Sequence, residues 1–161
     1  METLHKRAAR IPRDNLARWK SWLDFIQPHL ESDDISMLTT RANIANWTGR
    51  NGDVRRALEL HEALLPDRVR GLGADHPKTL RTRANIANWT GQTGNMRRAL
   101  ELHEALLPDR VRVLGADHPD TLRTRANIAD CTKLGGAKKI AAIIRNLLAN
   151  LHRDVNRKWR R

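Results

Sequence analysis

Residues 37–78 read MLTTRANIANWTGRNGDVRRALELHEALLPDRVRGLGADHPK, and residues 79–120 read TLRTRANIANWTGQTGNMRRALELHEALLPDRVRVLGADHPD. Only 8 of these 42 aligned positions differ. A third copy begins at Thr121 with TLRTRANIADCT and then diverges. A fixed period of this length indicates stacked supersecondary units, each of which buries its apolar face against its neighbours. Such stacks form long binding surfaces, so the repeat favours binding over catalysis.

The composition is that of one folded domain with a strongly basic end. The chain has 161 residues, 40% of them hydrophobic, and a formal net charge of +12. Residues 121–161 hold eleven basic and two acidic side chains, which accounts for +9 of that charge. This distribution indicates either a solvated basic surface or a partner with negative charge.

Membrane and export signals are missing from the sequence. No apolar run approaches the length of a membrane span, and the charged start METLHKRAAR is not followed by the apolar stretch of a secretory signal. Cys131 is the only cysteine, so no internal disulfide can form, which is typical of a reducing compartment. We therefore expect a cytoplasmic protein.

Each repeat is predicted to fold as two helices joined by a tight turn. In the second copy His76 is the expected N-cap, because the proline that follows it favours the first position of a helix. Apolar and small residues recur at helical spacing from Leu80 to Thr90. Gly94 is the expected left-handed turn residue, and the second helix is predicted to start near Asn95.

The second helix of the repeat contains a proline. Its predicted apolar stripe consists of Ala99, Leu100, Leu102, His103, Leu106 and Leu107. Pro108 follows directly, and we predict that it kinks or breaks the helix, since proline lacks the N–H donor and clashes with the preceding turn. Helix is then expected to resume from Asp109 to Leu114 and to stop at Gly115.

These residues resemble the tetratricopeptide repeat family in its longer, kinesin-light-chain-like form. Ile86 and Ala87 match the family's large-then-small pair in the first helix, Gly94 matches the inter-helix turn, and Ala99 matches the small residue of the second helix. The loop LGADHPDTL, residues 114–122, is typical of the longer class. The chain departs from the family pattern at Arg83, His103 and Pro108. The resemblance implies an all-α, right-handed α-solenoid of helix–turn–helix repeats.

The same register extends to both ends of the chain. We expect an N-terminal half repeat or cap at residues 1–36, full repeats at 37–78 and 79–120, and a degenerate third repeat at 121–161. In the last segment Ala141, Ile144 and Leu148 stand 42 positions after Ala99, Leu102 and Leu106, which predicts a modified second helix. This gives about seven helices. The half repeat is either a cap or a sign that the chain belongs to a longer array.

Polar side chains recur on one face of the first helix of each repeat, and the resemblance places that face in the concave groove of the solenoid. The predicted groove residues are Asn43, Asn46, Arg81, Asn85, Asn88, Gln92, Arg123, Asn127 and Asp130. A side-chain amide can pair with a peptide backbone without reading its sequence, and arginine can clamp a carboxylate. The alternative is that the asparagines only bridge neighbouring helices.

Trp47 and Trp89 occupy one position of the repeat, and Cys131 replaces them in the third copy. We expect the two indoles to pack between helices; the alternative is that they are exposed anchors for a partner.

The last predicted helix carries a long apolar stripe and a basic face. That face consists of Lys138, Lys139, Arg145, Arg153, Arg157 and Lys158. The helix is expected to cap the third repeat, but its stripe is longer than one repeat can cover. The alternatives are self-association, docking of a partner, contact with an anionic membrane, or contact with nucleic acid, for which no base-reading motif is present.

The sequence does not support an enzyme. It has no phosphate-binding glycine loop with the required spacing, and the second histidine of a zinc-protease motif is absent after His61 and His103. No Cys/His cluster has zinc spacing, so neither a metal nor a cofactor is expected.

Three functions therefore compete. The first is a scaffold that binds an extended peptide or a partner protein in the groove, where arginines would suit an acidic ligand. The second is a detached or remnant sensor piece of a larger signalling protein, which the resemblance suggests because long arrays in the family often accompany a nucleotide-hydrolysing switch domain. The third is electrostatic binding to nucleic acid or an anionic membrane through the C-terminal helix.

Overall fold

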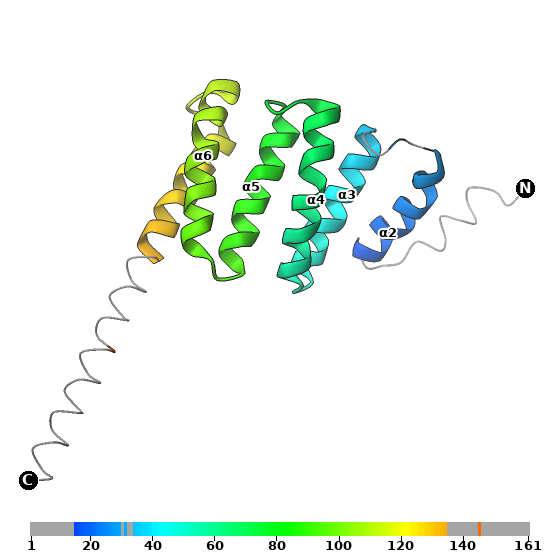
Figure 1. Ribbon diagram of the computed structural model, residues 1–161, viewed down its shortest axis with the longest axis horizontal. Helices are drawn as coiled ribbons and strands as arrows, with labels where there is room; N and C mark the ends of the chain where they lie inside the picture. Colours follow the sequence, from blue (N-terminus) through cyan, green and yellow to red (C-terminus); the bar gives the residue numbers. More distant parts are fainter. Residues whose placement is uncertain (1–14, 30, 32–33, 135–144, 146–161) are drawn as a thin grey trace, which may run out of the picture.

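Six α-helices follow one another in the part of the chain that the structure describes, and no strand occurs there. The computed structural model describes residues 15–29, 31, 34–134 and 145. The elements are α2 (Asn15–Ile26), the 3-10 turn η1 (Gln27–His29), α3 (Ile35–Arg50), α4 (Val54–Leu72), α5 (Pro77–Gln92), α6 (Met96–Leu114) and a helix over residues 119–134. Each helix from α2 to α6 packs against the next, and together they form a solenoid (Figure 1).

The helices begin where the capping residues predict. The side chain of His76 accepts a hydrogen bond from the backbone N–H of Lys78 at 3.1 Å, which confirms it as the N-cap of α5. The side chain of Asn95 caps α6 in the same way, 3.2 Å from the N–H of Arg98. Gly94 has a φ of 97°, as expected of the residue that turns the chain between the two helices.

Each repeat has a small core of the same composition. Leu80, Ala84 and Leu106 form it in the second repeat. Leu38, Ala42 and Leu64 occupy the equivalent positions in the first repeat and pack together in the same way. Each core joins the first helix of a repeat to the second helix of that repeat, so the paired helices form one unit of the stack.

Of the predicted kink or break at Pro108, the break is wrong. α6 runs without interruption through Pro108, and α4 runs through the equivalent Pro66. Both prolines are exposed. The carbonyl four residues before each proline, which has no N–H donor because proline lacks one, therefore lies on the solvent side. Arg83 also stabilises the next turn, because its guanidinium donates to Asp109 Oδ2 at 2.6 Å and to the carbonyl of Ala105 at 3.4 Å.

The two ends of the predicted array are described only in part. The half repeat is represented by α2 and η1, and residues 1–14 lie outside the described residues. The last predicted helix also lies outside them, except for Arg145, which is helical and exposed.

Trp89 packs between helices. Its ring lies so close to Gly49 of α3 that a Cβ at that glycine would be 2.4 Å from Cη2 of the indole. The equivalent glycine of the next repeat, Gly91, has no such neighbour, since the nearest atom to a Cβ there would be Cβ of Ala99 at 3.4 Å. Cys131 stands where a third tryptophan would be expected, which explains the extra space.

Gly49→Ala and Gly91→Ala form a matched test of this contact. Gly49→Ala forces the indole away, and we expect it to lower the free energy of unfolding by about 1–2 kcal/mol. Gly91→Ala meets only an ordinary contact, and the higher helix propensity of alanine should leave stability unchanged or raise it by up to ~1 kcal/mol. Urea unfolding of both variants measures the difference. Equal effects of the two substitutions would mean that the Trp89 contact does not constrain the junction.

Candidate functional site

A polar pocket of ≈ 230 Å³ lies between the first helices of the two full repeats. It is lined from α3 by Thr39, Ala42, Asn43, Asn46 and Arg50, from α4 by Arg68, and from α5 by Arg81 and Asn85. Four of the nine predicted groove residues are therefore brought together at one junction. The pocket lies across the junction of two repeats, so the stacking of the repeats creates it.

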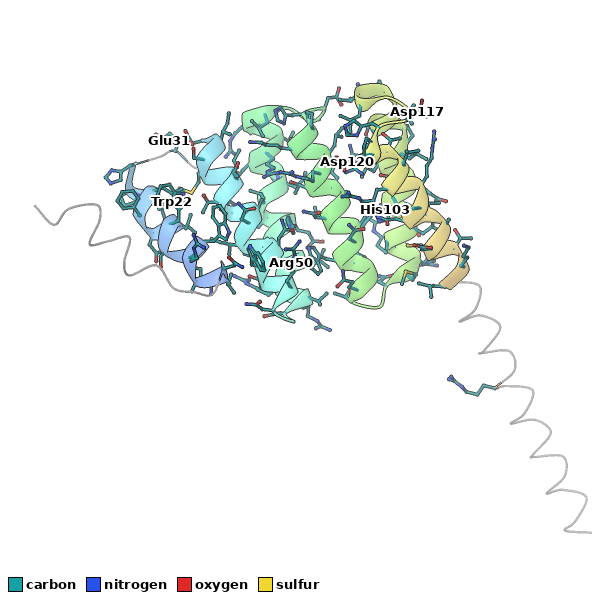
Figure 2. All side chains as sticks on the ribbon, turned by 180° about the vertical axis from the view of Figure 1, so that it is seen from behind. Trp22, Glu31, Arg50, His103, Asp117 and Asp120 are labelled. Carbon is teal, nitrogen blue, oxygen red and sulfur yellow. The ribbon has the colours of Figure 1, made fainter. Side chains whose placement is uncertain are left out.

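The pocket is positively charged. None of its lining residues is acidic, and three of them are arginines. Arg50 lies at the C-terminal end of α3 (Figure 2). Its guanidinium is 4.9 Å from the centre of the Trp47 ring. Within the described part of the chain neither Arg50 nor Arg81 forms an ion pair, and both are exposed. Both guanidinium groups are thus available to a carboxylate or another anion.

Arg68 lies beneath the pocket, and its side chain is almost wholly buried at 1% exposure. Its Nη1 donates to the carbonyl of Lys78 and, at 2.8 Å, to Oγ1 of Thr82; its Nη2 donates to the carbonyl of Leu38 at 3.2 Å. No carboxylate in the described part of the chain pairs with it. Burial, and then the charge of the nearby Arg81, lower the pKa of Arg68 to about 10, so the group keeps its charge at neutral pH.

The asparagines of successive repeats are hydrogen-bonded to one another. Asn85 Nδ2 donates to Asn46 Oδ1 at 3.2 Å, and Asn127 Nδ2 donates to Asn88 Oδ1 at 2.9 Å. These bonds link the first helix of each repeat to the first helix of the next. These four asparagines therefore do bridge neighbouring helices. The bridges use only part of their hydrogen-bonding capacity, because each amide has two donors and two acceptor lone pairs.

A buried histidine lies beside each link, His61 next to Asn46 in the first and His103 next to Asn127, at 3.5 Å from its Nδ2, in the second. His61 Nε2 lies 3.0 Å from Asn46 Oδ1, which requires Nε2 to carry the proton and donate. His61 is 0% exposed, and His103 of the next repeat, which is labelled in Figure 2, is 1% exposed. Burial, and then the charge of Arg68, lower the pKa of His61 from 6.5 to about 4. Burial, and then Arg110, lower the pKa of His103 in the same direction.

The junction between the second and third repeats has most of the same elements. Arg110 repeats the role of Arg68, since its Nη1 donates to the carbonyl of Asp120 at 2.6 Å and to Thr124 Oγ1 at 2.7 Å. Arg123 approaches Asp120 at 3.6 Å. The predicted groove residues that are exposed at this junction are Gln92, Arg123 and Asp130.

The predicted residues differ in how much hydrogen-bonding capacity their side chains have left for a ligand. Asn43 makes no side-chain hydrogen bond with any described residue, so its whole amide is available at the pocket. Of the basic C-terminal face, only Arg145 lies within the described residues, where it is exposed.

The sequence reasoning missed Arg50, Arg68 and Arg110. Arg68 and Arg110 occur at the same repeat position, but an isolated arginine in a helix is normally a surface residue. The burial of Arg68 could have been predicted from its spacing, because Arg68 falls on the same helical face as His61 and Leu64.

Metal binding and membrane insertion find no support in the described residues. No cluster of three or more His, Cys, Asp or Glu side chains there is arranged to hold an ion. None of the described helices combines the length and the apolar character needed to cross a bilayer.

Comparison with known proteins gives a family and a fold. The family model for the tetratricopeptide repeat matches residues 37–78 and 79–120. Two crystal structures of a kinesin light chain-like protein from Podosopora anserina with nearly identical TPR-like repeats, one of them a point variant, are similar to this chain, each with a TM-score of 0.69 and 21% identity. The similarity covers 82% of this chain but 62% of each of those chains. No curated protein matches the sequence.

The buried histidines predict a loss of stability in mild acid. As the pH falls below 6.5, the unfolded chain binds protons at His61 and His103, while the folded chain resists protonation of His61 down to about pH 4. The free energy of unfolding should therefore fall across this window, by about 2–3 kcal/mol from His61 alone. Chemical unfolding between about pH 7 and pH 4.5 measures it.

His61→Gln is the control for that experiment, because glutamine stays neutral and can still donate to Asn46. Its stability should depend less steeply on pH than that of the unsubstituted chain. An unchanged slope would show that His61 titrates normally in the fold.

Proposed function

This chain belongs to the tetratricopeptide repeat family, and we propose that it is an interaction module whose groove binds an extended peptide segment with acidic side chains. Repeats of this family generally act in protein–protein interaction and are generally non-catalytic. The acidic character of the ligand and its place in the groove are our proposal. The observation that carries it is the pocket between α3 and α5, which has three arginines and no acidic residue.

The arginines supply the preference for negative charge. Arg50 lines the pocket from α3 and Arg81 lines it from α5, and Arg68 of α4 adds a buried charge to the lining. An arginine can form a bidentate pair with a carboxylate, and its attraction is strengthened where water is partly excluded. A peptide with an Asp or Glu side chain would therefore be held at this junction.

The asparagines supply contacts that do not depend on the peptide's sequence. Asn43 is fully available, and Asn85 retains a carbonyl oxygen and one N–H after its bond to Asn46. These groups can pair with the carbonyl and N–H groups of an extended backbone. Because Asn127 and Asn88 repeat the arrangement 42 residues later, the ligand would continue along the groove into the second junction.

Arg50 and Arg81 are better test positions than the asparagines. Substitution of Asn85 or Asn88 removes a bond between repeats as well as a ligand contact, so a loss of binding would be ambiguous. Arg50 and Arg81 are exposed and make no ion pair with any described residue. Arg97 of α6 is a control for the loss of one positive charge, since its side chain is 92% exposed and, within the described part of the chain, pairs only with the exposed Glu101, at 3.8 Å.

Selection of random peptides displayed on phage against the full chain tests the proposal. We expect the selected peptides to be enriched in Asp and Glu. Arg81→Ala should weaken their binding about tenfold, as for the loss of a charged hydrogen bond. Arg50→Ala should weaken it similarly, and Arg97→Ala by less than about twofold. Fluorescence anisotropy with labelled peptides gives the Kd values.

Peptides without acidic enrichment would refute the proposed ligand class. If the peptides bind the Arg97→Ala variant as weakly as the Arg81→Ala variant, binding responds to net charge in general. The groove would then not be the peptide-binding site.

A further inference from the structure

The pocket between α3 and α5 holds more positive charge than a single carboxylate can balance. Arg50, Arg68 and Arg81 line it, and no acidic side chain does. A fourth cation reaches it, because Lys78 Nζ donates to Oγ1 of the lining residue Thr39 at 3.4 Å. A carboxylate carries one negative charge, whereas a phosphorylated side chain carries about −1.5 to −2 at neutral pH. The pocket therefore suits a doubly charged anion better than a singly charged one.

Arg68 shows that the fold itself does not compensate this charge. Its pKa is lowered first by burial and then by the positive charges of Arg81 and Arg41, and no carboxylate acts in the opposite direction. Its Nε is buried and has no hydrogen-bond partner among the described residues. An anion in the pocket would offset the repulsion between Arg68 and Arg81.

The accessible donors also suit an anion with three oxygens. Arg50 and Arg81 are exposed, have no ion pair with any described residue, and extend from two different helices. Asn43 adds an amide whose N–H groups are unused within the described residues. A guanidinium can donate two parallel bonds to a phosphoryl group, which offers three acceptor oxygens where a carboxylate offers two. Several of these donors can thus bind one phosphoryl group at once.

The second junction does not repeat this excess of charge. Gln92 stands 42 positions after Arg50, and Asp120 stands 42 positions after Lys78. At these two positions and those of the other two arginines, the first junction has four positive charges, and the second has two positive charges and one negative. Arg81 also borders the second junction, and even with it the net charge there is +2 against +4 at the first.

Asp120 acts directly on the cations of the second junction. Its carboxylate lies 3.6 Å from a guanidinium nitrogen of Arg123. Burial lowers the pKa of Arg110 and the charge of Asp120 raises it, so the acid partly compensates the buried cation there. Asp120, which is labelled in Figure 2, therefore makes the second junction less attractive to a dianion than the first.

We propose that the first junction binds a phosphoryl group carried by a phosphorylated serine or threonine of the extended peptide. Arg50 of α3 and Arg81 of α5 pair with its oxygens, and Lys78 and Arg68 add positive charge. The inference rests on the proposed function, which makes the groove a peptide site, and it narrows the ligand class from acidic to phosphorylated peptides. The asparagines of the second junction bind the continuing backbone.

A peptide explains the charge pattern better than a nucleic acid does. A nucleic acid carries a phosphate at every nucleotide, and proteins that bind single strands follow it with a continuous positive groove. The excess positive charge of this chain's groove is concentrated at one junction, and Asp120 and the exposed Asp130 follow it along the third repeat. One phosphoryl group on an otherwise weakly charged peptide matches that pattern.

Three pools of short degenerate peptides test this inference in the full chain. The pools are identical except for one fixed central residue, which is phosphoserine, glutamate or serine. The phosphoserine pool should bind at least about tenfold more tightly than the glutamate pool, because its extra charge and third oxygen engage donors that a carboxylate leaves free. Fluorescence anisotropy of the labelled pools gives the Kd values.

The other outcomes each overturn a different statement. Equal binding of the phosphoserine and glutamate pools, both above the serine pool, would refute the phosphoryl preference and leave the acidic-peptide function standing. Equal binding of all three pools would refute both. Inorganic phosphate, or a single-stranded RNA of the same length, that binds as tightly as the phosphoserine pool would show that the phosphoryl group comes from another source.

Arg50→Ala and Lys78→Ala test the cations of the first junction. The preference for phosphoserine over glutamate should fall to about threefold or less in each variant, because each removes a charge that the dianion needs. Arg97→Ala should leave the preference within about twofold of its original value, since the Arg97 side chain is 92% exposed on another helix. A preference that survives in both pocket variants would refute the site.

Transfer of the charges to the second junction tests whether these positions are sufficient. Adding Gln92→Arg and Asp120→Lys to the Arg50→Ala variant gives the second junction the charges of the first. The phosphoserine preference should then return to within about twofold of that of the unsubstituted chain. Circular dichroism checks that each variant keeps its helices. A folded triple variant without recovery would show that these positions do not determine the preference, and would overturn the assignment.

Discussion

The buried guanidinium of Arg68 is the contact on which the stack and its groove both depend. It reaches from the second helix of one repeat to the start of the next repeat, and it also holds the carbonyl of Leu38 in its own repeat. A charged group at 1% exposure is unfavourable unless it is hydrogen-bonded. The two Nη atoms of Arg68 have three acceptors while its buried Nε has none, so the neighbouring helices must keep the positions that supply those acceptors. Loss of these acceptors would leave a buried charge without hydrogen bonds, which makes the junction intolerant of sliding or rotation.

The same contact couples the packing of the repeats to the character of their surface. Arg68 lines the pocket from below, and its charge is one cause of the low pKa of His61. A neutral His61 then holds Asn46 in the orientation that receives Asn85. The polar groups that line the pocket are therefore fixed in place by the fold, which would reduce the ordering cost of binding the proposed peptide. Under that proposal, stability and recognition would share the same few side chains at this junction.

The local elements of the fold could be predicted because their signals are local. A histidine before a proline marked the start of α5, and Gly94 marked the turn, since each depends on backbone geometry within a few residues. The continuity of α6 through Pro108 could not be predicted in this way, because Arg83 stabilises it from another helix. The burial of Arg68 depends likewise on acceptors 10, 14 and 30 residues away. Helical spacing predicted that these polar side chains share one face, and four of the nine line the pocket between α3 and α5. Their bonds to one another could not be predicted, because they depend on how the repeats stack.

The two junctions of this chain are built from the same residues at the same spacing. Arg68 with Thr82 joins the first repeat to the second, and Arg110 with Thr124 joins the second to the third. A block of 42 residues inserted between them would create a further junction of the same kind without any new complementary surface. Each added block would therefore lengthen the row of asparagine links by one.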